Sequence, residues 1–158
     1  MTPPDYRYVL GVPWEEEARG DAHEMTSPVT LDIFVAGVAR TKGSWRPVRV
    51  GGKTRLLPQT NEKPWALAVA YAAREAKPVC IAKPQSVHVY LAFHVLRPKK
   101  PTNTFPGGDA DKLARSCLDA LGGGLAFDDD VQVTALHVTK RWSEQSGCRI
   151  SVHRVEEK

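Results

Sequence analysis

Two short acidic segments hold the residues in this sequence that are best suited to chemistry. Asp109-Ala110-Asp111 places two carboxylates two positions apart, and Asp128-Asp129-Asp130 places three in a row. Carboxylate oxygens are the ligands that Mg²⁺ and Mn²⁺ prefer, whereas zinc sites use mainly histidine and cysteine. The histidines show no metal-ligand spacing; they are His23, His88, His94, His137 and His153. The two segments are therefore candidates for a Mg²⁺ or Mn²⁺ site.

Each segment also has a purely structural interpretation. Asp111 would be a good N-cap, where a carboxylate is stabilised by the free backbone N–H groups of a helix. If the helix begins at Asp111, the extended chain before it would let Asp109 and Asp111 face the same point. The run 128–130 could be a solvated acidic turn, or the start of a strand with Asp128 and Asp130 on one side. The residues alone leave these alternatives open.

The elements that would position the acidic segments follow from hydrophobic periodicity. Alternating apolar residues predict strands, at 31–35, 87–95, 131–140 and 149–155. A hairpin is expected over 48–56, closed by Gly51-Gly52. Helical spacing predicts one helix from Thr60 or Asn61 to Lys77 and a second from about Asp111 to Leu121. The order predicts a single α+β domain with a mixed sheet of about five strands and two main helices.

Apolar stripes identify the expected buried sides of the two helices. In the first helix the stripe is Trp65, Val69, Ala72 and Ala76. In the second it is Leu113, Cys117 and Leu121. The strand faces in 31–35 and 87–95 would either pack under these helices or continue a core across a subunit interface.

Charge is unevenly distributed along the chain, whose net charge is +4. Residues 1–26 contain six acidic residues and two arginines, a balance of −4, so residues 27–158 have a balance of +8. We expect an acidic, flexible N-terminal tail over 1–26 and one folded domain over 27–158. A basic domain suits a polyanionic partner such as DNA, although excess Lys and Arg can also serve solubility alone.

The cysteines and the lengths of the apolar runs also indicate the cellular compartment of the protein. The three cysteines are Cys80, Cys117 and Cys148, an odd number with wide spacing. Inert thiols in a reducing, intracellular setting are the expectation. No apolar run is long enough to span a bilayer, and the acidic N-terminus is not typical of a signal peptide. We therefore expect no membrane partner and a cytoplasmic protein.

The acidic segments and their neighbours resemble the RusA family of Holliday-junction resolvases. The run Asp109-Ala110-Asp111-Lys112-Leu113-Ala114-Arg115 is similar to the family's D-x-D-N-x-x-K. Leu118-Asp119-Ala120-Leu121 matches its D-A-L, and Asp129-Asp130-Val131-Gln132-Val133 matches its D-D-x-Q-V, with Lys140 as the trailing lysine. Gly37 and Lys42-Gly43-Ser44-Trp45-Arg46 look like the glycine and basic segment of phage-type members. The resemblance covers about residues 29–155.

The resemblance implies a homodimeric, Mg²⁺-dependent endodeoxyribonuclease that nicks opposing strands of four-way DNA junctions in recombination and repair. Such an enzyme would work in a bacterial cytoplasm, including that of a phage host. The family's metal carboxylates correspond to Asp109, Asp111 and Asp130, with Asp129 as a supporting acid. Mg²⁺ is the expected cofactor, and Mn²⁺ is an alternative.

Two residues depart from the family pattern. Lys112 stands at the asparagine position, and Arg115 stands at the functional lysine position. Arginine keeps the positive charge and can clamp a phosphate, but it is a poor proton donor. The structural alternative for Arg115 is an i,i+4 pair with Asp111 or Asp119 on the helix surface.

The remaining basic residues are candidates for DNA contacts; they are Lys42, Arg46, Arg97, Lys99, Lys100, Lys112 and Lys140. Lys140 lies ten positions beyond Asp130, about 33 Å along a straight strand. It is therefore expected to contact DNA or lie near a partner subunit, outside the site that contains Asp130. Two rival functions stay open: a non-catalytic junction-binding protein, and a nuclease acting on flaps, other branched DNA or plain duplex.

Overall fold

The computed structural model describes residues 28–43, 45–58 and 63–156. The expected N-terminal tail and the expected helix-start residues Thr60 and Asn61 lie outside the described residues.

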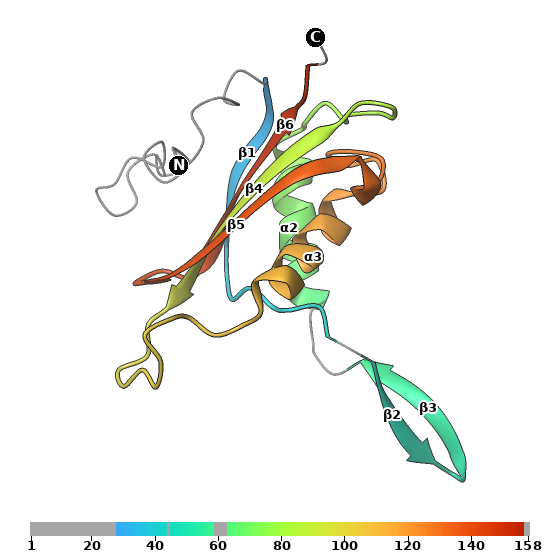
Figure 1. Ribbon diagram of the computed structural model, residues 1–158, viewed down its shortest axis with the longest axis vertical. Coiled ribbons are helices and arrows are strands. Elements are labelled where there is room, and N and C mark those ends of the chain that lie inside the picture. Colours follow the sequence, from blue (N-terminus) through green and yellow to red (C-terminus); the bar gives the residue numbers. More distant parts are fainter. Residues whose placement is uncertain (1–27, 44, 59–62, 157–158) are drawn as a thin grey trace.

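The main sheet has four strands, in the order β1-β6-β4-β5 (Figure 1). These are β1 (Val29–Ala36), β6 (Gly147–Arg154), β4 (Val87–Leu96) and β5 (Val133–Ser143). Strand β6 pairs antiparallel with both β1 and β4, whereas β4 and β5 are parallel. The mixed sheet and the α+β class predicted from periodicity are confirmed. The other two strands form a separate hairpin.

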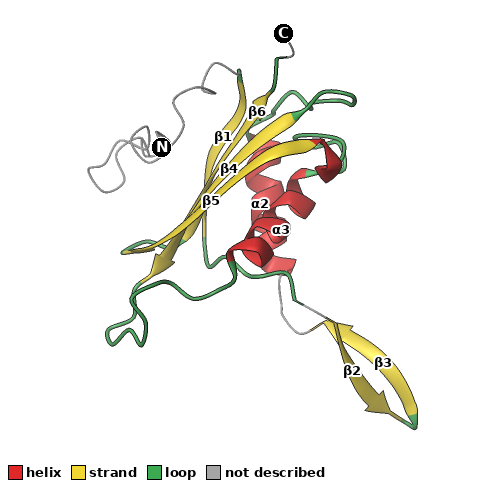
Figure 2. Ribbon diagram, in the orientation of Figure 1, coloured by secondary structure: helices red, strands yellow, loops and turns green. Residues whose placement is uncertain are grey.

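Both helices lie on one face of this sheet (Figure 2). Helix α2 (Lys63–Glu75) buries Trp65, Val69 and Ala73, and helix α3 (Ala110–Leu121) buries the expected Leu113, Cys117 and Leu121. The apolar residues of β1 and β4 meet them; Leu31, Val35, Val87, Val89, Leu91 and Phe93 are all buried. The apolar strand faces thus pack under the helices of the same chain. Neither helix in the described residues has the length and apolarity of a membrane span.

The predicted stripe of the first helix was wrong at its end. Ala76 is exposed and Ala73 is buried instead, because the helix stops at Glu75 and Ala76 lies past its last turn. Ala72 is only partly buried at the edge of the core.

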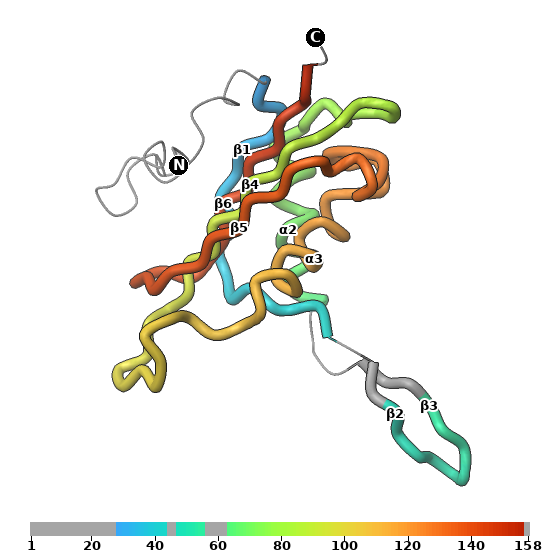
Figure 3. The backbone as a smooth tube through the Cα atoms, in the orientation of Figure 1, coloured from blue at the N-terminus to red at the C-terminus, as the bar shows by residue number. Residues whose placement is uncertain are grey.

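Strands β4 and β5 are joined through α3, which makes a parallel β-α-β unit. Helix α3 runs back along the sheet, so its first turn lies at the C-terminal ends of these strands (Figure 3). Its last turn lies at the beginning of β5, where the Gly123 N–H donates to the Asp128 carbonyl at 3.1 Å. The two ends of α3 therefore correspond to opposite ends of β5.

The hairpin of β2 (Trp45–Val50) and β3 (Lys53–Pro58) extends away from the sheet and helices (Figure 1). Its turn is the predicted Gly51-Gly52, with φ of 58° and 75°. Two consecutive positive φ values suit a tight hairpin turn and are easily adopted only by glycine.

The strand expected from Val131 begins two residues later. Asp130–Gln132 form a short 3₁₀ turn, η3, and β5 starts at Val133. The expectation that Asp128 and Asp130 share one side of a strand was therefore wrong. The side chain of Asp129 accepts a hydrogen bond from the Val131 N–H, and this cap favours a helical turn over an extended chain.

Candidate active site

Asp109 and Asp111 lie at the first turn of α3. The helix spans Ala110–Leu121, which confirms the prediction of a helix from about Asp111 to Leu121. Its N-cap is Asp109, so the interpretation of Asp111 as the N-cap was wrong. The Asp109 carboxylate makes no capping hydrogen bond, and its side chain is 65% exposed. Gly108, at φ 87°, turns the chain into the helix. Asp111 is also exposed, so both carboxylates can accept a ligand from solvent.

Lys112 neutralises part of this acidic pair. Its Nζ lies 3.0 Å from Oδ2 of Asp109, an i,i+3 ion pair. The hydrogen bond to Asp109 and the charge of that carboxylate raise the pKa of Lys112, so the ammonium form is favoured. The residue that departs from the family pattern therefore shares Asp109 with any cation that binds there.

Arg115 is exposed one helical turn after Asp111. Within the described part of the chain it forms no ion pair with Asp111 or Asp119. Asp119 instead accepts a hydrogen bond from Nζ of Lys42, whose own N–H donates to the Lys112 carbonyl at 3.1 Å. The surface-pair interpretation of Arg115 finds no support in this arrangement.

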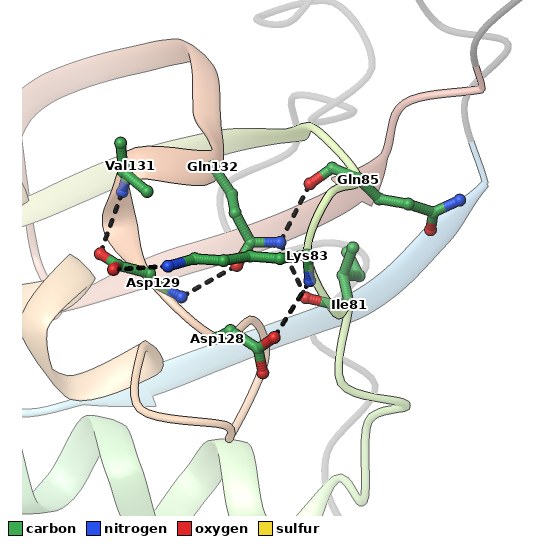
Figure 4. Close-up of polar contacts among 7 residues, drawn as sticks. All are labelled: Ile81, Lys83, Gln85, Asp128, Asp129, Val131 and Gln132. Atoms are coloured by element: carbon green, nitrogen blue, oxygen red, sulfur yellow. Dashed lines mark hydrogen bonds and ion pairs between the residues drawn. The ribbon is translucent and has the colours of Figure 1, made fainter.

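The second acidic segment, residues 128–130, forms a turn that is fastened to the loop before β4 (Figure 4). Asp129 accepts hydrogen bonds from the Val131 N–H at 3.3 Å and from Nζ of Lys83 at 3.0 Å. The Lys83 hydrogen bond is the main reason why the pKa of Asp129 is lowered. Asp128 accepts from the Lys83 N–H at 3.0 Å and lies 3.7 Å from Sγ of Cys80.

Gln132 completes this network from inside the protein. Its Oε1 accepts from the Asp129 N–H at 2.9 Å, and its Nε2 donates to the Ile81 and Gln85 carbonyls at 3.0 Å each. Lys83 and Gln132 were not among the predicted site residues. The Asp129-x-x-Gln132 spacing of a capping box was a usable signal for Gln132, whereas nothing local in the sequence points to Lys83.

The three carboxylates predicted to bind metal do not lie close together within one chain. Asp109 and Asp111 lie at one end of α3, and Asp130 follows its other end, about 18 Å away by the rise of a twelve-residue helix. Among the described residues, no group of three or more His, Cys, Asp or Glu side chains could hold a metal ion. Asp128 and Asp129 accept hydrogen bonds from Lys83, and Asp109 pairs with Lys112.

Lys140 lies beside the Asp109 end of the unit. Its Nζ donates to the Pro106 carbonyl at 2.8 Å and the Gly108 carbonyl at 2.6 Å. It therefore holds the loop that leads into the acidic pair.

The other predicted DNA contacts are more scattered. Arg97, Lys99 and Lys100 are exposed in the loop between β4 and α3, and Lys42 lies against α3. The side chain of Arg46 lies outside the described residues.

The two buried thiols, Cys117 and Cys148, are not part of either acidic segment's chemistry. Cys117 and Cys148 are buried and all three cysteines are free. Burial, and then the neighbouring Cys117, raise the pKa of the Cys148 thiol well above its ordinary value. Cys148 is therefore protonated at neutral pH and unreactive.

Comparison with protein-family models identifies the family to which this chain belongs. The model of the endodeoxyribonuclease RusA family matches residues 37–153. The chain belongs to the RusA family. The matched range includes both acidic segments and every element from β4 to β5. RusA proteins are endodeoxyribonucleases that act on branched DNA junctions. No curated protein matched the chain.

Proposed function

We propose that this chain is a Mg²⁺-dependent endonuclease that resolves four-way DNA junctions by paired nicks, acting as a homodimer in the cytoplasm. The observation that carries the proposal is the exposed pair Asp109 and Asp111 at the first turn of α3, in a chain of the RusA family. Surrounding positive charge supports it, because Lys112, Arg115, Lys99 and Lys100 lie on the helix or on the loop leading into it.

The carboxylates proposed as metal ligands support Mg²⁺ binding only in part. Exposed carboxylate oxygens are suitable ligands for a hard divalent cation. One chain, however, brings together two of the three proposed ligands, because Asp130 lies at the opposite end of α3. We therefore assign no catalytic step to the carboxylates of a single chain.

Arg115 is proposed to bind the scissile phosphate. A guanidinium can form two parallel hydrogen bonds to phosphate oxygens, and Arg115 is exposed on the same side of α3 as Asp111, one turn away. Arg115→Ala should lower the cleavage rate strongly, whereas Arg115→Lys, which restores the family residue, should keep or raise it. Single-turnover cleavage of a junction measures both variants. Wild-type rates for Arg115→Ala would remove the phosphate-binding role.

The test of the function compares a synthetic four-way junction with a linear duplex of the same arm sequence, each with Mg²⁺ and with a chelator. We expect cleavage of the junction only when Mg²⁺ is present. Asp111→Asn should abolish cutting while junction binding is retained, because the change removes a proposed ligand and also weakens repulsion of phosphate. Glu75→Gln, an exposed acid at the end of α2, is the matched control and should cut normally.

The same assay separates the rival functions. A wild-type protein that binds the junction but cuts nothing with Mg²⁺ or Mn²⁺ is a non-catalytic junction-binding protein. Faster cutting of flaps or linear duplex than of the four-way junction assigns a different nuclease substrate.

A further inference from the structure

Phe105 is an exposed aromatic residue a few positions before the acidic pair Asp109 and Asp111. It lies in the loop between β4 and α3, and its side chain is 59% exposed. No other aromatic residue occurs in the stretch 97–109. Single exposed apolar residues are common on protein surfaces, so exposure alone gives Phe105 no role. Its role follows from the way in which the loop around it is held.

The backbone on both sides of Phe105 is fixed by side chains of β5. Nε1 of Trp142 donates to the Thr104 carbonyl at 3.2 Å, and Nζ of Lys140 donates to the Pro106 carbonyl at 2.8 Å. Pro106 itself is buried. The residues before and after Phe105 are thus attached to the sheet, while the aromatic ring stays mostly in solvent. A side chain on a fixed backbone loses little further backbone entropy when it binds a partner.

Lys140 also connects Phe105 to the acidic pair. Its Nζ lies 5.9 Å from the centroid of the Phe105 ring and donates to the Gly108 carbonyl at 2.6 Å. Gly108 directly precedes Asp109, the N-cap of α3. One ammonium group therefore contacts both the ring and the chain that enters α3, so the ring lies beside the Asp109 end of this helix.

The loop of Phe105 also carries positive charge. Arg97, Lys99 and Lys100 are exposed in it, and Asp109 is the one acidic residue of the stretch 97–109. Basic side chains that follow a phosphate backbone, together with an aromatic ring that stacks on a base, are the means by which proteins bind unpaired or unstacked nucleotides. The loop therefore has the chemistry to bind DNA at a place where a base face is accessible.

We propose that Phe105 inserts at the branch point of a DNA junction and stacks on a base there. The identity of the DNA rests on the proposed function. A branch point interrupts the continuous stack of bases, so an aromatic ring takes the place of a neighbouring base more easily there than inside a duplex arm. Phosphate contacts by the lysines of the loop bind all DNA shapes alike. Phe105 therefore provides the preference for branched DNA.

Stacking at this position also determines where the DNA is cut. The ring lies beside the start of α3, so a base stacked on it places the phosphates next to the branch point near Asp109 and Asp111. Wild type should nick at a fixed short distance from the branch point. Phe105→Ala should nick at more positions along each arm, as mapped on sequencing gels with one labelled strand at a time.

The main test measures affinity for a four-way junction and for a linear duplex of the same arm sequence, without divalent cations so that nothing is cut. Losing one base–aromatic stack in Phe105→Ala should lower junction affinity about fivefold to hundredfold and leave duplex affinity unchanged. Phe105→Trp keeps an aromatic face and should keep the junction preference. Tyr71→Ala, on α2, is the matched control because Tyr71 is also an exposed aromatic residue, at 65%. It should bind both DNAs like wild type.

A fluorescent adenine analogue reports the stacking directly. Its fluorescence rises when it loses a neighbouring base, and it is placed either at the branch point or in the middle of an arm. Wild type should raise the signal at the branch point only. Phe105→Ala, added until the junction is saturated, should not raise it at either position. An equal rise at the branch point with Phe105→Ala would overturn the insertion.

Trp142 serves as a positioning residue for Phe105. Trp142→Phe removes the hydrogen bond to the Thr104 carbonyl but keeps an apolar ring. We expect it to reduce the junction preference less than Phe105→Ala does, and to cause no further loss when the two changes are combined, because both act through the same stack. Independent, additive losses would overturn this positioning role.

The outcomes separate this inference from the proposed function. Stacking at the branch point is refuted if Phe105→Ala binds the junction like wild type, or if it loses affinity for junction and duplex equally. It is also refuted if wild type binds the junction no more tightly than the duplex. If Phe105→Ala loses the junction preference but wild type cuts no DNA with Mg²⁺ or Mn²⁺, the stacking is supported and the nuclease function is refuted.

Discussion

At the scale of single residues, the acidic positions of this chain divide into two kinds. Asp109, Asp111 and Asp130 are exposed at element ends, where they can bind a cation. Asp128 and Asp129 accept hydrogen bonds from Lys83 and from backbone N–H groups, which orients the turn that carries Asp130. Asp129 is thus better described as a positioning residue than as a ligand.

Lys112→Asn, which restores the family residue, should strengthen Mn²⁺ binding. The ion pair between Lys112 and Asp109 must be broken or shared when a cation binds, and an exposed pair of this kind has a small effect. We expect the dissociation constant for Mn²⁺ to fall about twofold to fivefold, as measured by Mn²⁺ titration. Lys63→Asn, at the start of α2, should leave it unchanged, and an equal gain in that control would assign the effect to general charge.

Asp129 gives the turn a defined pH dependence. Its pKa is lowered in the folded protein, chiefly by the hydrogen bond from Lys83, so its contribution to stability is present above the ordinary carboxyl pKa. That contribution is lost as the pH falls through the lowered value. The free energy of unfolding should therefore decrease less steeply with acid in Lys83→Met than in wild type. Parallel acid profiles for the two proteins would contradict this role of Lys83.

At the scale of elements, the β-α-β unit of β4, α3 and β5 determines where each candidate ligand lies. Asp109 and Asp111 lie at the start of α3. The second acidic segment, residues 128–130, comes after the end of α3 and the three glycines that follow it. Because parallel strands need a crossover, the two segments must lie at opposite ends of the unit.

The start of β6 requires a glycine, because a Cβ on Gly147 would lie 2.6 Å from the Val35 carbonyl oxygen.

Gln132→Ala should destabilise the contact between the β-α-β unit and the loop before β4. The change removes two hydrogen bonds to the Ile81 and Gln85 carbonyls from a buried side chain, and with them the capping box. We expect a loss of about 1–3 kcal/mol in the free energy of unfolding. Thermal or denaturant unfolding measures it, with the exposed Thr134→Ala as control. A loss of stability no larger than that of the control would show that the network is dispensable.

At the scale of the whole molecule, positive charge is presented on two extensions of the compact body. One is the β2–β3 hairpin, and the other is the loop between β4 and α3, which carries Arg97, Lys99 and Lys100 (Figure 1). The loop leads directly into the Asp109 end of α3. A DNA arm that reaches Asp109 and Asp111 would therefore pass this loop.

Lys99→Ala with Lys100→Ala should weaken binding to junction and duplex alike. Phosphate contacts carry no sequence or shape information of their own, so affinity should decrease by a similar factor for both substrates. If each lysine neutralises one phosphate, the salt slope should fall by about 0.9 per lysine replaced. Filter binding over a salt series measures it, and a slope equal to wild type would place the loop away from DNA.

The sequence by itself determined the strands, the hairpin turn, the mixed α+β class and the RusA motifs. These depend on local chemistry, because periodicity and turn residues act within a few positions. Local reasoning was wrong about two details next to the acidic segments. The N-cap of α3 is Asp109 and not Asp111, and a 3₁₀ turn capped by Asp129 precedes β5, where a strand was expected from Val131.

Only the tertiary structure decided which candidate residues lie together. The motif suggested three ligands of one site, yet the crossover from β4 to β5 separates Asp130 from Asp109 and Asp111 by the length of α3. The same crossover brings Lys140 beside Gly108, although Lys140 is far from Asp109 in sequence. Such distances depend on strand direction and helix length, which no single motif encodes.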